Sequence, residues 1–463
     1  MRKENTAKKK VKNPQEHLSF GQLLLWNTSA VSRSIALLFT GYLMYYCTDT
    51  LGVPAAGVSI ILVASKILDG VTDMVAGFIV DRTQTRWGKG RPYEVFIVGL
   101  WLCTWLMFSC PPQFSMILKY VWIFVMYALV NSICFTFLNA NQAPYIVRAY
   151  SSQQIVKQTS YGSIVTMLAA VAFNITFPIL MGRLATSAAG WSALAAIFAV
   201  PLAAIGILRM IFVKEKNDVD VTANQEEKLK VADVITVMRQ NKYILLLAST
   251  SLIFNFVTNM GIGTYYYKYI VGDVSLMSVA AAAQAIAIPL ALVFPQLISR
   301  FSVVKLMIAG YFISAVGYLI FFFAGSSVPL LVVGAILSGM GTIPASMLIG
   351  LVILDCADYN EWKGIHRMEG TMSSINGLGG KIGAAIGAGM LGILLQISGY
   401  TGVAETMPDS AYLMIKLLMS LIPMALYILT GLSLFTYKLD KKLPQIKAEN
   451  AARRAAAEAE LKK

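Results

Sequence analysis

Long apolar stretches separated by short polar breaks run along almost the whole chain. A stretch of about 18 or more apolar residues is long enough to cross a bilayer as a helix, and Gly, Pro and charged positions mark the breaks. About twelve membrane-spanning helices are predicted. The predicted spans are 20–47, 54–80, 93–112, 117–147, 155–183, 190–213, 243–271, 276–299, 303–325, 328–356, 370–398 and 410–437. The pattern therefore indicates an all-α membrane protein.

A polar, charge-rich segment at 214–242 divides these spans into two groups. Apolar and charged positions alternate within it, which predicts a short amphipathic helix at the membrane surface. Basic tails at 1–18 and 439–463 flank two six-helix halves, 19–213 and 243–438. Two halves joined by a charged linker is the layout of a major facilitator-type transporter, whose site lies near the membrane midplane between the halves.

Composition favours a membrane protein and argues against nucleic acid binding. Of 463 residues, 57% are apolar and 13% are charged, a balance unlike that of ordinary soluble domains. The net charge of +14 collects in the tails and short loops. Basic loops face the cytoplasm and attract lipid headgroups. We therefore expect a multi-pass protein of the cell membrane with both termini in the cytoplasm.

Residues that carry metal, redox or phosphate chemistry are sparse. The chain has five Cys and two His, and their spacing fits no disulfide framework or metal motif. No phosphate-binding loop of the Walker type occurs. We expect a transporter rather than an enzyme, with no cofactor, acting as a functional monomer on a small solute, a coupling cation and membrane lipids. A membrane-embedded lipid-modifying enzyme, and a channel or flippase of the same fold, are the alternative classes.

The most informative polar residues lie inside the second predicted span. Lys66, Asp69 and Asp73 follow one another at i, i+3 and i+7, so they share one face of the helix. A charge at the bilayer centre costs about 2.5–3.5 kcal/mol on insertion scales, so each needs a partner, an ion or water. Two inward carboxylates can coordinate Na⁺ or share protons, with Lys66 as a coupling residue. The alternative is a Lys66–Asp69 salt bridge that only fixes helix packing.

A series of short motifs resembles the glycoside–pentoside–hexuronide:cation symporter family over about residues 20–400. The motifs are 42–49, 66–73, 86–92, 255–259 with 265–269 and 272–273, 355–363, and 379–381. Their order and spacing make the resemblance specific. It implies secondary active symport of a glycoside, coupled to Na⁺, Li⁺ or H⁺. An alternative of the same fold is a coupled or uncoupled transporter of another small organic anion or solute.

The resemblance implies a cation site on the second span. There Asp69 and Asp73 match the family's two essential carboxylates. Thr72 stands where the family's Asn or Thr contributes an oxygen, and Thr136 matches a hydroxyl near the cation. Lys381 on the eleventh span matches a lysine beside the carboxylates, and is expected to act in coupling.

The substrate side departs from the galactoside-transporting members of that family. Where those have an aspartate on the first span and another on the fourth, this chain has Arg33 and Asn139. A guanidinium suits a carboxylate, sulfate or phosphate, so an acidic sugar such as a hexuronide is one interpretation. A salt bridge from Arg33 to Asp69 or Asp73 is the other. Further candidate substrate residues are Asn255, Asn259 and Tyr265 on the seventh span.

A basic loop after the second span is expected to act in gating. Its side chains can meet helix ends and acidic residues of the other half, and so hold one alternating-access state. Positive-inside topology and a solvated helix end are the plainer alternatives. The candidate gating residues are Asp81, Arg86, Lys89 and Arg91 in the loop, and Asp355, Asp358 and Glu361 at the end of the tenth span.

Small residues recur on the eleventh span. Gly379, Gly383 and Gly387 are spaced four apart. This spacing predicts close packing against a neighbouring helix.

Overall fold

The computed structural model describes residues 19–215, 241–286, 289, 293–364, 369–402 and 407–461. Within these ranges the chain forms helices joined by short turns. The predicted amphipathic helix of the linker and the basic N-terminal tail lie outside the described residues.

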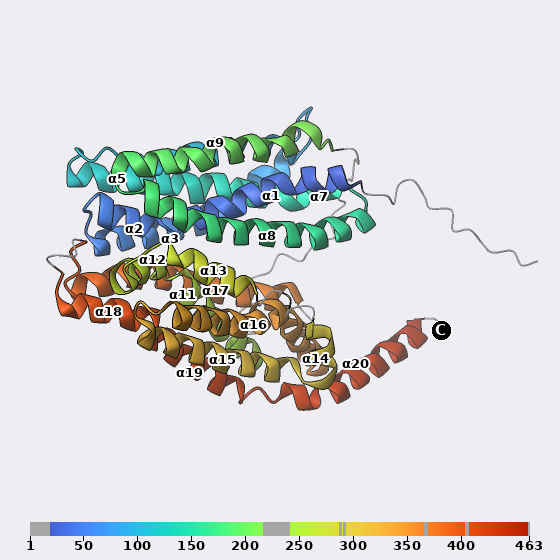
Figure 1. The fold of residues 1–463 in the computed structure, drawn as a ribbon. Helices are drawn as coiled ribbons and strands as arrows, with labels where there is room; N and C mark the ends of the chain where they lie inside the picture. The colour runs from blue at the N-terminus through green and yellow to red at the C-terminus, as the bar shows by residue number, and fades with distance from the viewer. Residues whose placement is uncertain are drawn as a thin grey trace, which may run out of the picture.

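The helices form two groups that lie one above the other, with the first half of the chain in one group and the second half in the other (Figure 1). The first group holds α1 (Phe20–Thr40), α2 (Leu43–Tyr45), η2 (Tyr46–Thr50), α3 (Ala55–Arg82), η3 (Arg91–Val95), α4 (Phe96–Met107), α5 (Met116–Ala128), η4 (Leu129–Phe135), α6 (Thr136–Ala140), α7 (Gln142–Ala149), α8 (Ser152–Leu184) and α9 (Ala188–Phe212). The second holds α11 (Lys242–Asn259), α12 (Gly263–Tyr266), η5 (Tyr267–Val271), α13 (Leu276–Ala285), α14 (Phe294–Arg300), α15 (Val303–Ala324), α16 (Val328–Trp362), α17 (Glu369–Ile397), α18 (Asp409–Met419), α19 (Leu421–Leu434) and α20 (Leu439–Leu461).

Most of the predicted spans have the length and composition of membrane helices. Among the described residues, eight helical stretches qualify, and a ninth does if α11 and the helix after it, bent by 42°, count as one span. The helices α1 and α4 and the α13–α14 segment stand where the remaining three spans are predicted. The η2, η4 and η5 segments are π-helical. Such segments often occur at functional sites.

The glycine stripe of α17 brings two helix backbones together. A Cβ added at Gly383 would lie 2.0 Å from the carbonyl oxygen of Leu252 in α11, and one at Gly379 would lie 2.3 Å from that of Ala248. A third at Gly387 would lie 2.5 Å from the carbonyl oxygen of Phe256. Because no side chain fits in these places, the predicted close packing of this span is confirmed.

Contacts between the two halves position the site. The long helix α3 packs against α17, and α8 packs against α13. These pairings place the charged face of α3 and one face of α8 at the boundary between the halves. The short helices α2, α12 and α18 gather at one end of this boundary (Figure 1).

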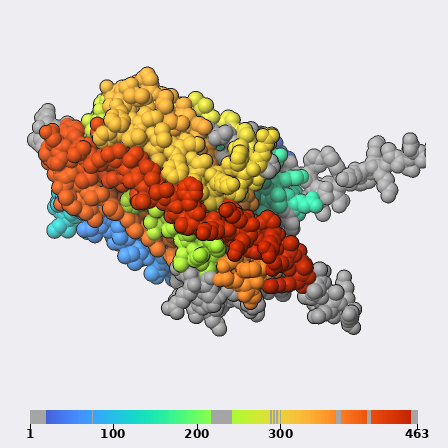
Figure 2. All heavy atoms as spheres, turned by 90° about the horizontal axis from the view of Figure 1, so that it is seen from below, coloured from blue at the N-terminus to red at the C-terminus, as the bar shows by residue number. Residues whose placement is uncertain are grey.

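The C-terminal helix α20 packs against the end of α16. Figure 2 shows the last helices of the chain running diagonally along one face of the C-terminal half. The indole N–H of Trp362 donates to Glu449 at 2.6 Å, and the amide of Gln445 donates to the same carboxylate at 2.8 Å. These hydrogen bonds hold the pKa of Glu449 below its ordinary value. The bond from Trp362 also links α20 to α16, whereas that from Gln445 lies within α20.

Candidate functional site

A cavity of about 720 Å³ lies between the two halves and collects most of the predicted ion-coupling residues. Helices α1, α3 and α17 and the segment from η4 to α7 line it. Its charged and amide lining includes Arg33, Lys66, Asp69, Asp73, Asn139 and Lys381. We call it the Asp69 cavity. Its volume falls in the range of about 300–1,000 Å³ that is usual for small-molecule sites.

Asp69 and Asp73 each interact with one hydroxyl group and one lysine. Asp69 accepts a hydrogen bond from Lys66 Nζ at 3.1 Å, and another from the hydroxyl of Ser132. Asp73 accepts from Thr136 Oγ1 at 2.8 Å, and Lys381 Nζ lies 3.4 Å from its carboxylate. The two carboxylates therefore remain separate, each with its own partners, and Lys381 reaches Asp73 from the other half.

The hydroxyls that donate hydrogen bonds to these carboxylates come from one helix face of the fourth span. Ser132 and Thr136 are four residues apart, where η4 passes into α6, so both point toward α3. Thr136 was expected from the family resemblance, whereas Ser132 was not. Its spacing from Thr136 is the sequence signal that could have revealed it.

Thr72 donates its hydroxyl proton to its own helix. Its hydroxyl donates to the carbonyls of Leu68 and Asp69 in its own helix, both at 3.2 Å. A hydroxyl in a helix can always bond back to the preceding turn in this way. In this structure Ser132 supplies the hydroxyl that donates to Asp69, while the Thr72 oxygen keeps its acceptor lone pairs, so its role at the cation site stays a prediction.

Arg33 lies in the same cavity but has its own partners. Its Nη1 donates to the carbonyl of Leu138 at 3.0 Å and to Asn139 Oδ1 at 3.2 Å. The amide of Gln142 lies beside it, with its oxygen placed to accept from Arg33 as well as from Arg209. The predicted substrate residues Arg33 and Asn139 are thus in direct contact. The alternative salt bridge to Asp69 or Asp73 is not the arrangement of this structure.

A fully buried ion pair supports this side of the cavity. Arg209 on α9 donates to Glu94 through Nε at 2.8 Å and also through Nη2, and both side chains are 0% exposed. The amide of Asn141 donates to Glu94 at 2.9 Å. Buried charges need such pairing and hydrogen bonding. Sequence reasoning missed this pair, although an Arg inside an apolar span is a signal for it.

The three predicted substrate residues of the seventh span lie elsewhere. The amides of Asn255 and Asn259 donate to the carbonyls of Ser251 and Asn255 in their own helix, each at 2.9 Å. Tyr265 is fully buried, and its hydroxyl lies 2.9 Å from that of Thr48. None of the three lines the Asp69 cavity. A run of tyrosines at a span end looks alike in sequence whether it stacks on a ligand or packs in the core.

Tyr265 belongs to a second polar cluster, which joins the two halves at the end near α2 and α12. Asp49 accepts hydrogen bonds from Lys268 Nζ at 2.6 Å, Tyr269 Oη at 2.6 Å and Tyr400 Oη at 2.5 Å. The hydroxyl of Thr48 donates to it at 2.7 Å. We call these residues, with Tyr265, the Asp49 cluster. They connect η2 of the first half to η5 and the α17–α18 connection of the second.

The basic loop after α3 is anchored within its own half. Arg91 donates through Nε to the carbonyl of Met210 at 2.6 Å and through Nη2 to that of Ile211 at 3.1 Å. The Glu215 carboxylate accepts from the backbone N–H groups of Lys89, Gly90 and Arg91 at 2.8–2.9 Å.

The remaining gating candidates of this loop are placed as follows. The guanidinium of Arg86 lies 5.9 Å from the centre of the Trp87 ring. Asp81 is in α3, and its side chain lies outside the described residues.

The acidic end of α16 pairs with α20. Lys447 Nζ lies 2.9 Å from Asp355 and 3.8 Å from Asp358. Arg454 donates to Glu361 through Nε at 2.6 Å and through Nη2. The sequence suggested partners for these acids in the other half, but these contacts are with the C-terminal helix. Ion pairs from α20 could not be foreseen, because residues 439–463 were expected to form a basic tail outside the six-helix half.

The ligands at Asp69 and Asp73 suit a hard monovalent cation or a proton. Among the described residues, no group of three or more His, Cys, Asp or Glu is placed to hold a metal ion. The cavity offers two carboxylates and hydroxyl oxygens, which are hard ligands. Imidazole and thiolate ligands, which transition metals favour, are missing from its lining.

Comparisons with known proteins agree with this architecture. The family model described as "MFS/sugar transport protein" matches residues 32–441. An isoprimeverose transporter of Lactiplantibacillus pentosus is 28% identical over 431 residues, which cover 91% of this chain and 88% of that protein. A glucuronide carrier protein homolog of Escherichia coli (strain K12) is 24% identical over 447 residues, covering 94% and 96%.

Solved structures share the fold at low sequence identity. A bacterial homolog of the human lysosomal transporter Spinster, in an inward-facing and unoccupied conformation, superposes with a TM-score of 0.66 at 13% identity, covering 92% of this chain and 98% of that one. A D-xylose–proton symporter gives a TM-score of 0.62 at 13% identity, covering 91% and 98%. The predicted fold class is confirmed, as is the resemblance to glycoside–pentoside–hexuronide:cation symporters. This multi-pass membrane protein therefore belongs to the MFS/sugar transport protein family.

Proposed function

We propose that this protein is a cation-coupled symporter that imports a glycoside bearing an anionic group, such as a hexuronide. One observation carries the proposal. A single cavity holds the carboxylates Asp69 and Asp73 together with a guanidinium, Arg33, that has partners other than these carboxylates. The cavity can therefore serve a cation and an anionic substrate at the same time.

The coupling step in this proposal is an exchange of partners at Asp69 and Asp73. With no ion present, Lys66 and Lys381 offset the repulsion between the carboxylates. Na⁺, Li⁺ or H⁺ would replace a lysine contact, and Ser132 and Thr136 would supply hydroxyl oxygens beside the carboxylates. Lys381 belongs to the other half, so this exchange would change the contact between the halves. A ligand can drive such a change only by binding one state better than the other.

The charge of the cavity supports an anionic substrate. Three cationic side chains, Arg33, Lys66 and Lys381, line the same cavity as the two carboxylates. The cavity thus has one positive charge in excess before the coupling cation enters. A carboxylate or sulfonate on the sugar would offset this charge, and by replacing the contacts of Arg33 with Asn139 and Gln142 it could bind the guanidinium through two hydrogen bonds. Relatives include a glucuronide carrier protein homolog and a putative sulfoquinovose importer, both of Escherichia coli (strain K12).

The membrane and orientation follow from the charge pattern. The basic loops and tails favour a cytoplasmic location for both termini, and the bacterial relatives favour the cell membrane. In this orientation the Asp49 cluster lies at the extracellular end of the molecule, and the contacts of α16 with α20 lie at the cytoplasmic end.

Transport by purified protein in liposomes tests the proposal. Uptake of labelled methyl β-D-glucuronide should be driven uphill by an inward Na⁺ or H⁺ gradient, and methyl β-D-glucoside should compete about tenfold less well. Replacing Arg33→Ala should remove this preference, because a bidentate charged pair contributes about 1.5–3 kcal/mol, or about 10–150-fold in affinity. Arg183→Ala, at an exposed site on α8, is the matched control.

Two results would contradict the acidic-sugar assignment. Neutral glycosides could compete as well as acidic ones, or Arg33→Ala could change ion dependence without changing the substrate ranking. The second candidate is uncoupled transport of a small organic anion, favoured by the lysines that already pair with both carboxylates. Uptake that is indifferent to Na⁺ and to pH gradients would select it.

A further inference from the structure

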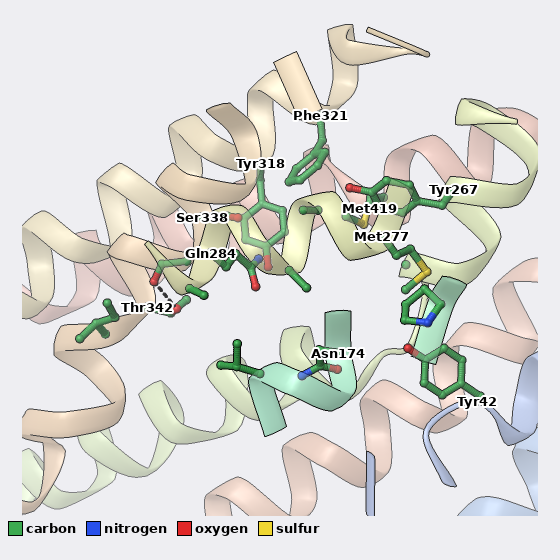
Figure 3. Close-up of a pocket in the computed structure, with 18 residues that line it drawn as sticks. Tyr42, Asn174, Tyr267, Met277, Gln284, Tyr318, Phe321, Ser338, Thr342 and Met419 are labelled. Atoms are coloured by element: carbon green, nitrogen blue, oxygen red, sulfur yellow. Dashed lines mark hydrogen bonds between the residues drawn. The ribbon is translucent and has the colours of Figure 1, made fainter. Parts of the chain in front are cut away.

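A second cavity, of about 440 Å³, lies at the boundary between the halves and has an uncharged lining. Figure 3 shows Tyr42 and Asn174 of the N-terminal half across from Gln284, Tyr318 and Thr342 of the C-terminal half. Among its lining residues, all of which the structure describes, there is no Asp, Glu, Lys, Arg or His. We call it the neutral cavity. It shares no lining residue with the Asp69 cavity.

Several polar groups in the neutral cavity lack partners. The hydroxyl of Tyr267 is enclosed and has no hydrogen-bond partner. Among the described residues, none forms a hydrogen bond with the side chains of Tyr42, Asn174 or Gln284 either. Buried polar groups left unpaired cost free energy, so native proteins satisfy them with protein, water or ligand. The enclosed Tyr267 hydroxyl is such a group, and the less enclosed side chains of Tyr42, Asn174 and Gln284 keep their hydrogen-bonding capacity for an occupant.

The hydroxyls of Thr342 and Ser338 are oriented by their own helix. The Thr342 hydroxyl donates to the carbonyl of Gly339 at 2.8 Å (dashed in Figure 3), and that of Ser338 donates to Ala335 at 3.1 Å. With their protons used in this way, both oxygens face the cavity as acceptors. The two amides each offer donors and an acceptor. The lining can therefore bind hydroxyl groups, which both donate and accept.

The charge and shape of the lining narrow the class of ligand. An ion placed here would lose its hydration without meeting an opposite charge, which is costly. A purely apolar ligand would leave the amides unsatisfied. The rings of Tyr42, Tyr267, Tyr318 and Phe321 offer apolar faces beside the polar groups. An uncharged sugar ring, with hydroxyls at its edge and C–H groups on its faces, fits both requirements.

We propose that the neutral cavity is a subsite for an uncharged sugar ring of the transported glycoside. This inference rests on the proposed function, in which Arg33 holds the anionic end of the same molecule. Both cavities meet the segment that runs along α1 into α2. Arg33 lines the first and Tyr42 the second, nine residues further on. At a rise of 1.5 Å per residue they are about 13.5 Å apart along the axis, so a substrate longer than one ring is needed to reach both.

Because the lining comes from both halves, a ring in the neutral cavity would contact both. Asn174 lies on α8, and Gln284 lies on α13, which packs against α8. The neutral cavity therefore acts in selecting the length of the glycoside, while the Asp69 cavity selects its charge. Single-ring and two-ring substrates should respond differently to changes in its lining.

Equilibrium binding to the purified full chain, in saturating Na⁺, tests this subsite. The probes are D-glucuronate, which has one acidic ring, and glucuronosyl-xylose, which joins the same ring to a neutral one. Gln284→Leu should weaken binding of the disaccharide about tenfold and leave glucuronate unchanged, since about 1.4 kcal/mol corresponds to a factor of ten. Tyr267→Phe removes one hydroxyl only, so it should fold normally and weaken disaccharide binding several-fold. Gln113→Leu, at an exposed site between α4 and α5, is the control.

The outcomes separate this inference from the proposed function. If the variants weaken both probes equally, or neither, the subsite is wrong even though the wild-type protein binds acidic sugars. If the wild-type protein binds neither acidic probe, the acidic-sugar function is wrong, and the same variants are then compared on glucose and lactose. A loss specific to lactose would still support the subsite. Failure to bind any of the four sugars would contradict both proposals.

Discussion

The aspartates of the Asp69 cavity and of the Asp49 cluster differ in their exposure and in the number of their hydrogen-bond partners. Asp69 and Asp73 have side chains that are 18% and 44% exposed, and each has one lysine and one hydroxyl partner. The Asp49 side chain is 3% exposed and accepts four hydrogen bonds. A carboxylate has about four lone-pair sites, so Asp49 is saturated. The cavity carboxylates can therefore take a new partner, whereas Asp49 cannot.

This difference also separates two roles at the boundary between the halves. At Asp73, the partner from the other half is Lys381, whose side chain is 76% exposed and 3.4 Å away. At Asp49, three partners from the other half lie within 2.6 Å. A pair of exposed charges contributes little stability, while an enclosed one is costly to break. The first contact is suited to exchange during transport, and the second is suited to hold one end closed.

Removing a cavity carboxylate should have the largest effect on transport. In Asp69→Asn or Asp73→Asn the cation loses a charged ligand, and hydrogen bonds to charged groups contribute about 1.5–3 kcal/mol. We expect cation binding to weaken about 10–150-fold and uphill uptake in liposomes to disappear, with the protein still inserted. Asp273→Asn, at an exposed turn after η5, should transport normally. Undiminished uphill uptake in both cavity variants would remove the ion-coupling proposal.

Breaking the Asp49 cluster should instead affect stability and access. In Asp49→Asn the ammonium of Lys268 loses its carboxylate, and since this lysine is 35% exposed we expect a loss of about 1–3 kcal/mol, less than for a fully buried pair. The thermal unfolding midpoint should fall. Loosening of this end should also expose Cys47, which is fully buried two residues away. Its labelling by a membrane-impermeant maleimide, with the other cysteines replaced, should speed up.

The variant Asp273→Asn also serves as the control for the Asp49 experiment. It removes a carboxylate at the same end of the molecule without touching the cluster. If Asp49→Asn matches this control in both unfolding midpoint and Cys47 labelling, the cluster does not hold the two halves together.

Sequence reasoning could foresee the cavity carboxylates because they are local to one helix. Lys66, Asp69 and Asp73 fall on one face by helical spacing alone, and a charged stripe inside an apolar span has few explanations. The Asp49 cluster joins residues more than 200 positions apart, such as Asp49 and Tyr269. No local period marks such a cluster. Only the packing of the two halves brings it together.

The fold could be predicted from the sequence more fully than the contacts of individual side chains. Apolar length and polar breaks suffice to place the spans, because the bilayer requires both. They do not show that the Thr72 hydroxyl turns back to its own helix, or that Tyr265 is enclosed. Those outcomes depend on which neighbour fills the adjacent space. The glycine stripe of α17 is the exception, since small residues report directly on a close neighbour.

Removing the amine of Lys381 should have a moderate effect that is confined to coupling. The ammonium is well exposed, so Lys381→Met should change the unfolding midpoint little. Asp73 would lose its partner from the other half, and we expect the cation dependence of uptake to shift several-fold while exchange of substrate persists. Lys305→Met, at an exposed position at the start of α15, is the control. Wild-type cation dependence in Lys381→Met would show that this lysine plays no part in coupling.

The smallest change in cation affinity is expected for a substitution at Ser132, which donates a hydrogen bond to one cavity carboxylate. The Ser132 hydroxyl donates to Asp69, so Ser132→Ala removes one hydrogen bond and leaves both lysines in place. A hydrogen bond to a carboxylate, partly replaced by water in an open cavity, contributes about 0.5–1.5 kcal/mol, or about 2–12-fold in cation affinity. Substrate affinity at saturating cation should not change, because Ser132 does not line the cavity near Arg33. Ser249→Ala, whose hydroxyl donates to the carbonyl of Leu246 in its own helix, controls for loss of a hydroxyl within a span.

Titration of uptake against Na⁺ and against pH measures the effect of Ser132→Ala. A change in substrate affinity with an unchanged cation response would place Ser132 in the sugar site instead, and would assign the hydroxyl at Asp69 a structural role like that of Thr48 at Asp49.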